Sequence, residues 1–117
     1  MTAVGDTNIP MGLEWGWHTL SPIGPFADGK DYGIKNMQKV VVLMTDGQNQ
    51  NTVANNGNAS YYSGIGYIWQ NRIGVGASST AAQRQTALDN RLSLLCTNMK
   101  AKGIFIYTVR VLSLIHI

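Results

Sequence analysis

The residues best suited to chemistry are the oxygen-bearing side chains of two short segments. GDTN, at residues 5–8, stands just before a predicted helix, and TDG, at residues 45–47, ends an apolar run. Hydroxyl and carboxylate oxygens are the ligands that hard cations such as Mg²⁺ take, together with water, in octahedral geometry. Asp-Gly is also ordinary turn chemistry at the end of a strand. Asp46 is therefore either a metal ligand or a turn residue, and spacing alone leaves both open.

A helix and a strand are predicted to position these oxygens. The spacing of apolar residues over 7–20 predicts a helix, with Thr7 or Asn8 as its cap and Pro10 in its first turn. Residues 39–45, KVVVLMT, predict a strand. Its apolar run is continuous rather than alternating, which is typical of a strand covered on both faces of a parallel sheet.

A second helix and a second strand follow a long polar loop. The loop covers residues 47–79, with one short local element expected at 67–73. The next helix starts at about Ser79 and ends at Gly103, which suits a C-terminal cap. A second strand is predicted over 103–111. The apolar stripe of the second helix consists of Leu88, Leu92, Leu95, Cys96 and Met99.

This order of elements predicts the fold class. A strand–helix–strand crossover makes neighbouring parallel strands, so we expect an α/β protein with an open, doubly wound (Rossmann-like) parallel sheet. Ligands of such sheets bind beyond the carboxyl ends of the strands, where Asp46 is expected. Two strands make a small sheet, so we also expect the first strands of the domain to be missing.

Three segments resemble the von Willebrand factor A-type domain, in the form found in TadG-like proteins of tight-adherence (Flp) pilus assembly. They are GDTNIPMGLEWGWHTLSP, KVVVLMTDGQN and GIFIYTVRV, and the resemblance covers residues 4–111. It implies an incomplete A-domain fold with a metal-ion-dependent adhesion site. Thr7 would be the threonine ligand of that site, and Asp46 the aspartate that acts through water.

One motif of the family is absent. No DxSxS occurs in the 117 residues, although the family needs it at the end of its first strand. We therefore expect Mg²⁺ or Mn²⁺ to bind the intact domain and to bind this chain weakly or not at all. The resemblance implies a module that binds and does not catalyse. Its partner would be a protein of the pilus assembly machinery, in the bacterial cell envelope, that offers an acidic side chain to the metal. It also implies an N-terminal membrane anchor in the parent protein.

Two other functions stay open. Asp46 could be catalytic in a fragment of an α/β-fold hydrolase, with Thr7 as the only candidate nucleophile. A base is needed near the same edge of the sheet, and His18 is expected on the wrong side of its helix unless that helix is short. The chain could also be a purely structural A-type domain whose site has degenerated. Separately, the aromatic residues Tyr61, Tyr62, Tyr67 and Trp69 of the long loop either contact a partner or pack locally.

Composition excludes several classes. The nine basic residues are scattered, so the net charge of +3 does not indicate a nucleic-acid surface. No apolar run approaches the ~18–20 residues of a membrane span, and we expect the chain itself to be soluble. Cys96 is the only cysteine, so it is either a buried thiol or, as the envelope location implies, a partner for a cysteine elsewhere in the full protein.

The last six residues form a separate case. LSLIHI, residues 112–117, resembles a translation of the transposon end used in sequencing libraries, CTGTCTCTTATACACATC. We expect this tail to be an artefact of read-through and His116 to have no function.

Overall fold

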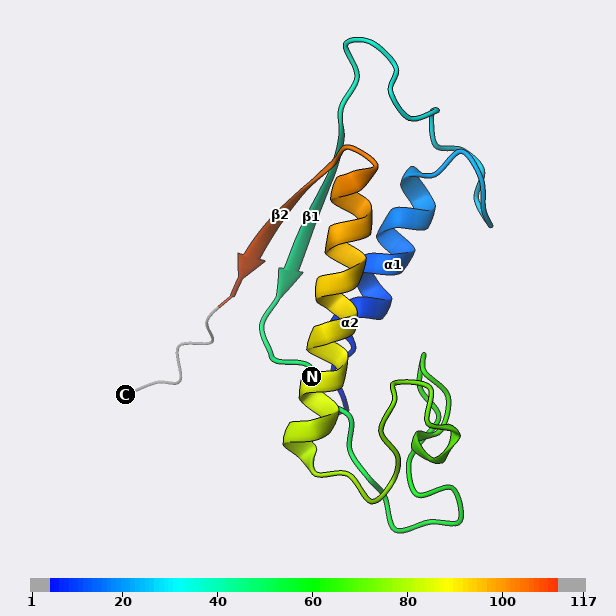
Figure 1. The fold of residues 1–117 in the computed structure, drawn as a ribbon, viewed down its shortest axis with the longest axis vertical. Coiled ribbons are helices and arrows are strands. Elements are labelled where there is room, and N and C mark those ends of the chain that lie inside the picture. The colour runs from blue at the N-terminus through cyan, green and yellow to red at the C-terminus, as the bar shows by residue number, and fades with distance from the viewer. Residues whose placement is uncertain (1–4, 112–117) are drawn as a thin grey trace.

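The computed structural model describes residues 5–111, and the expectations for residue 4 and for the tail at 112–117 lie outside this range. The elements follow the predicted order (Figure 1). They are α1 (Ile9–Leu20), β1 (Lys39–Thr45), the short 3₁₀ turn η1 (Ile68–Gln70), α2 (Ala81–Ala101) and β2 (Ile104–Arg110).

Local capping explains where both helices begin. The Asn8 side chain accepts a hydrogen bond from the Met11 amide (3.1 Å), so Asn8, one of the two predicted caps, is the N-cap and α1 begins at Ile9. At α2, the Thr80 hydroxyl accepts from the Gln83 amide (3.2 Å), and the Gln83 side chain accepts from the Thr80 amide (2.8 Å). This reciprocal pair satisfies two amides that the helix leaves without partners. Gly103 follows α2 with a φ of +77°, the left-handed conformation that glycine adopts readily.

The two strands pair in parallel, as predicted, in a register that runs from Lys39↔Ile104 to Thr45↔Arg110. Both helices pack on the same face of this sheet (Figure 1). Within residues 5–111 the chain is therefore a small mixed α/β structure with a two-stranded parallel sheet. A doubly wound sheet needs helices on both faces, and the described residues supply one face only.

The core lies between the helices and that face. Its fully buried members are Leu13 of α1, Met99 of α2 and Ile104 of β2. Cys96 is half-buried against them, so its thiol packs as part of the core. The other half-buried side chains around this cluster are Trp17, Leu20, Tyr32, Val41, Leu92, Leu95 and Ile106.

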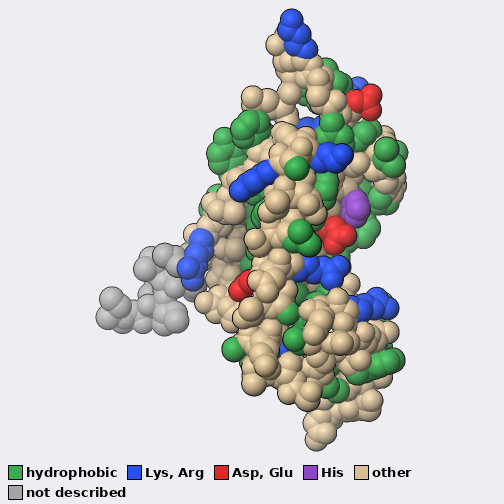
Figure 2. Space-filling model, viewed as in Figure 1, with side chains coloured by type: hydrophobic (Ala, Val, Ile, Leu, Met, Phe, Trp, Pro, Cys, Tyr) green, Lys and Arg blue, Asp and Glu red, His purple; other side chains and the backbone are tan. Residues whose placement is uncertain are grey.

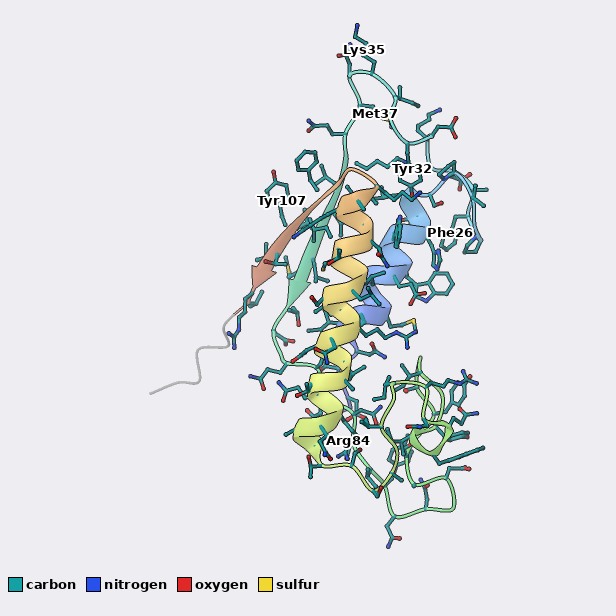
Figure 3. All side chains as sticks on the ribbon, in the orientation of Figure 1. Phe26, Tyr32, Lys35, Met37, Arg84 and Tyr107 are labelled. Carbon is teal, nitrogen blue, oxygen red and sulfur yellow. The ribbon has the colours of Figure 1, made fainter. Side chains whose placement is uncertain are left out.

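The prediction that β1 is covered on both faces is wrong for the described residues. Val41 points into the core, whereas Val42 is 62% exposed. Tyr107 projects from β2 on the side away from α2 (Figure 3). The reason is that α1 and α2 occupy the same side of the sheet, so alternate side chains of an apolar strand stay in water. The exposed sheet face consists of Val40, Val42, Met44, Phe105, Tyr107 and Val109.

This difference between the faces can be measured with matched double variants. Val42→Thr with Met44→Thr changes only the exposed sheet face, so self-association should fall while the free energy of unfolding stays within about 0.5 kcal/mol. Val41→Thr with Leu43→Thr places two hydroxyls toward the core and should cost roughly 2–4 kcal/mol. Sedimentation velocity at several concentrations and urea unfolding give the two readings. Equal destabilisation by both pairs would contradict the assignment of faces.

A buried lysine joins α1, the following loop and β1. Lys39 is only 8% exposed, and its ammonium group donates hydrogen bonds to the backbone oxygens of Leu20 and Lys30. The ammonium also lies 4.3 Å from the centroid of the Tyr32 ring, whose hydroxyl accepts from Trp17 Nε1 (2.9 Å). Leu20 is the last residue of α1, where the helix dipole favours a cation.

Replacing this ammonium should loosen the whole junction. Lys39→Met keeps the stem but leaves buried carbonyls without donors, so the free energy of unfolding should fall by about 1–3 kcal/mol. Lys35→Met, at the exposed tip of the same loop, is the matched control and should change it by less than about 0.5 kcal/mol (Figure 3). Urea unfolding followed by tryptophan fluorescence measures both. An unchanged free energy of unfolding in the Lys39→Met protein would show that this lysine does not stabilise the fold.

Candidate functional site

The segment before α1 meets the chain just beyond β1. Thr7 and Gln50 form a short antiparallel bridge, with N–O distances of 3.2 Å from the Thr7 amide and 2.8 Å from the Gln50 amide. The Thr7 hydroxyl lies 3.8 Å from the position that a Cβ would take on Gly47. The two segments singled out in the sequence, GDTN and TDG, therefore lie side by side at the carboxyl end of β1.

The turn after β1 does not use the Asp46 carboxylate. It is closed by Thr45, whose hydroxyl accepts from the Gly47 amide (3.3 Å) and donates to the Gly47 carbonyl (3.2 Å). Asp46 is exposed, and its side chain makes no hydrogen bond to residues 5–111. The turn is thus closed by Thr45, and a solvent-exposed Asp46 carboxylate suits a turn residue as well as a ligand that acts through water.

The neighbouring carboxylates already have protein partners. Both oxygens of Asp6 accept from Thr52, one from its amide (2.8 Å) and one from its hydroxyl (2.6 Å). Asp89 accepts from the Asn49 side-chain amide (2.7 Å). These contacts tie the chain beyond β1 to the segment before α1 and to α2. They stabilise the edge of the sheet where Thr7 meets the TDG turn, which we call the rim.

The donor set fits part of a metal shell. Thr7 and Asp46 offer the hydroxyl and carboxylate oxygens that Mg²⁺ or Mn²⁺ favours. Across residues 5–111 no group of three or more His, Cys, Asp or Glu side chains is arranged to hold a metal ion. Thr7 and Asp46 are two candidate ligands, and an octahedral site needs more than two.

A polar cleft of about 540 Å³ adjoins the rim. Its walls are Thr7, residues 47–52 and the first turns of α2, including Arg84. Asp46 does not line this cleft. The Oδ1 atom of Asn51, itself 8% exposed, is buried in the cleft wall without a hydrogen-bond partner in the described part of the chain.

Arg84 joins the two ends of the long loop, which we call its neck, and no sequence pattern predicted this role. The residue is 6% exposed and lies in the first turns of α2 (Figure 3). Its Nε donates to the Asn51 carbonyl (2.7 Å), and its Nη1 donates to the carbonyl of Ser79 and approaches the Ser79 hydroxyl (3.3 Å). One guanidinium thus binds both ends of the loop.

Beyond this neck the loop is an ordered unit. Ile65 and Ile68 are 5% and 2% exposed, and the Ile68 amide donates to the buried Ser60 hydroxyl (2.9 Å). Gly64 lies against Met11 of α1, where a Cβ would come within 2.8 Å of the Met11 Cε. On the side of α2, Arg91 Nη1 donates to the Arg72 carbonyl of the loop (3.4 Å). The loop therefore has a small core of its own and contacts both helices.

A scan against models of known protein families, a search of curated proteins and a search of solved structures each returned no match. The resemblance to the A-type domain thus stays a prediction from three sequence segments. In residues 5–111, no helix has both the length and the apolar content needed to cross a membrane.

The neck contact predicts a local effect of mutation. Arg84→Met removes the donors to Asn51 and Ser79, so amide hydrogen exchange should speed up across residues 52–78 while the sheet keeps its protection. Arg110→Met, an exposed arginine of β2, is the matched control and should leave the loop unchanged. Hydrogen-exchange mass spectrometry resolves the two regions. Unchanged exchange in the Arg84 variant would show that the loop stays closed by other contacts.

Proposed function

We propose that this chain is the C-terminal portion of a von Willebrand factor A-type domain and serves as a binding module of a TadG-like pilus assembly protein. The observation that carries the proposal is the meeting of Thr7 with the TDG turn, where Thr45 closes the turn and leaves the Asp46 carboxylate unengaged by residues 5–111. The carboxyl end of a strand, where this free carboxylate lies, is the place where open α/β sheets bind their ligands.

In this proposal Thr7 donates its hydroxyl oxygen to a Mg²⁺ or Mn²⁺ ion, and Asp46 binds the ion through water. The remaining protein ligands come from a DxSxS segment that this sequence lacks. The cation supplies an open coordination position, which a carboxylate of the protein partner fills. The role of the chain is to hold and orient oxygen atoms, so no bond of the partner is broken.

A hydrolase receives less support from the contacts of its candidate base. His18 packs edge-to-face on Trp15, with ring centroids 5.3 Å apart, and lies close to Gly24. These contacts are toward the C-terminal end of α1, whereas Thr7 precedes its N-terminus. His18 is therefore engaged away from the rim that carries Asp46.

The test is a Mn²⁺ titration followed by electron paramagnetic resonance, which reports the free ion. The source locus is first sequenced upstream, and a longer form that carries DxSxS is prepared. It should bind Mn²⁺ saturably, and Asp46→Asn or Thr7→Val should weaken binding by about 10–100-fold, as the loss of a ligand-shell group does. The present chain should not saturate below about 1 mM, the weak end of sites built from oxygen ligands.

Asp31→Asn, in the exposed loop before β1, is the control and should bind like the unmodified long form. An upstream sequence without DxSxS would overturn the proposal. Equal affinities of the Asp46 and Asp31 variants would overturn it as well. Turnover of a simple ester that depends on Asp46 would favour the hydrolase instead.

A further inference from the structure

The long loop holds large aromatic side chains in water although it has a core of its own. Tyr61 and Tyr62 are 78% and 72% exposed, whereas Ile65 and Ile68 of the same loop are buried. Trp69 is 57% exposed. More than half of each ring is thus open to solvent, and Tyr and Trp side chains are enriched in binding sites.

Two of these rings line a cavity. The space measures about 540 Å³, within the ~300–1,000 Å³ of typical small-ligand sites. Its aromatic wall is formed by Tyr61 and Tyr62, and its polar groups include the Asp6 carboxylate. The complete lining is Gly5, Asp6, Thr52, Tyr61, Tyr62 and Ser63.

Two members of the cavity lining, Tyr62 and Asp6, are positioned by contacts within the chain. Tyr62 packs edge-to-face against Tyr67, with ring centroids 5.3 Å apart and an interplanar angle of 73°. Tyr67 in turn is fixed by its amide, which donates to the Gln70 side chain (2.9 Å). Thr52 orients both oxygens of Asp6, each of which keeps a lone pair for another donor. Side chains positioned in this way lose less conformational entropy when a ligand binds.

The chemistry of the surroundings selects an uncharged, hydroxyl-rich ligand. Between residues 47 and 79 the only charged side chain is Arg72, and Asn, Gln, Ser and Tyr dominate the rest. On the face shown in Figure 2, the lower part of the molecule, where this loop lies, carries few charged side chains. Amides and hydroxyls bond sugar hydroxyls, and the C–H face of a pyranose ring packs on an aromatic ring.

We propose that the Tyr61–Tyr62 cavity binds a neutral saccharide. The two tyrosine rings stack on sugar faces. The Asp6 carboxylate accepts hydrogen bonds from sugar hydroxyls, and the Ser63 hydroxyl donates to them and accepts from them. Loops rich in Tyr, Ser, Gly and Asn also bind proteins. The concave shape of this cavity and the single oriented carboxylate in it favour a ring-sized polar ligand over a flat protein surface. The proposal does not depend on a metal ion.

The test uses the full chain on a glycan microarray in buffer with EDTA, followed by isothermal titration with the best neutral oligosaccharide. Tyr61→Ala and Tyr62→Ala alter exposed side chains, so both should fold normally by circular dichroism and bind at least tenfold more weakly. Asp6→Asn should also weaken binding. Tyr107→Ala, which removes an exposed tyrosine from the sheet face, is the matched control and should bind like the unmodified chain.

Three outcomes would overturn the proposal. They are no binding to any neutral glycan, binding only to sulfated or sialylated glycans, and binding that survives both tyrosine substitutions. Binding to an immobilised peptide library at Tyr61 and Tyr62, without glycan binding, would assign the cavity to a protein partner. Because EDTA removes divalent cations, a negative result here leaves the Mn²⁺ titration unaffected, and the two proposals fail separately.

Discussion

The buried ammonium group of Lys39 is the interaction on which the layout of the molecule depends. It binds the last carbonyl of α1 and a carbonyl of the next loop from a position at the start of β1. The C-terminus of α1 is thereby fixed at the start of β1, so α1 runs antiparallel to the strand. As a result the N-terminal end of α1, with Thr7, reaches the opposite end of β1, where Asp46 lies. An electrostatic contact at one end of the sheet sets the geometry of the rim at the other.

Local features of the structure could be predicted from the sequence, whereas the packing of the helices on one face of the sheet could not. Helix caps such as Asn8 and Gly103 and the apolar run of β1 act through neighbours in the chain, and their residue types show it. The covering of β1 depends on which face both helices occupy, and an unbroken apolar run carries no such information. The exposure of Val42 to solvent therefore cannot be predicted from the sequence of the strand.

The rim was likewise predictable from the sequence, whereas the neck of the long loop was not. The meeting of Thr7 with Gly47 agrees with the general rule that helix starts and strand ends share one edge of a parallel sheet. The role of Arg84 could not be predicted from the sequence, because its partners are carbonyl groups 33 and 5 residues away. Every residue has a carbonyl, so the partners have no distinctive residue type. Asp6 was visible in the sequence only as part of GDTN. The two hydrogen bonds from Thr52 hold the Asp6 carboxylate in the lining of the Tyr61–Tyr62 cavity, whereas Thr7 lies at the rim.

The closed neck at Arg84 also bears on how such a protein can evolve. With Asn51 and Ser79 held by one side chain, the intervening residues form an insert whose ends stay at a fixed separation. The entropy cost of closing such an insert grows only with the logarithm of its length. Residues can therefore be added, lost or exchanged between these two points with little disturbance to the sheet and helices. The exposed side chains of this insert can therefore change while the framework that carries them keeps its geometry.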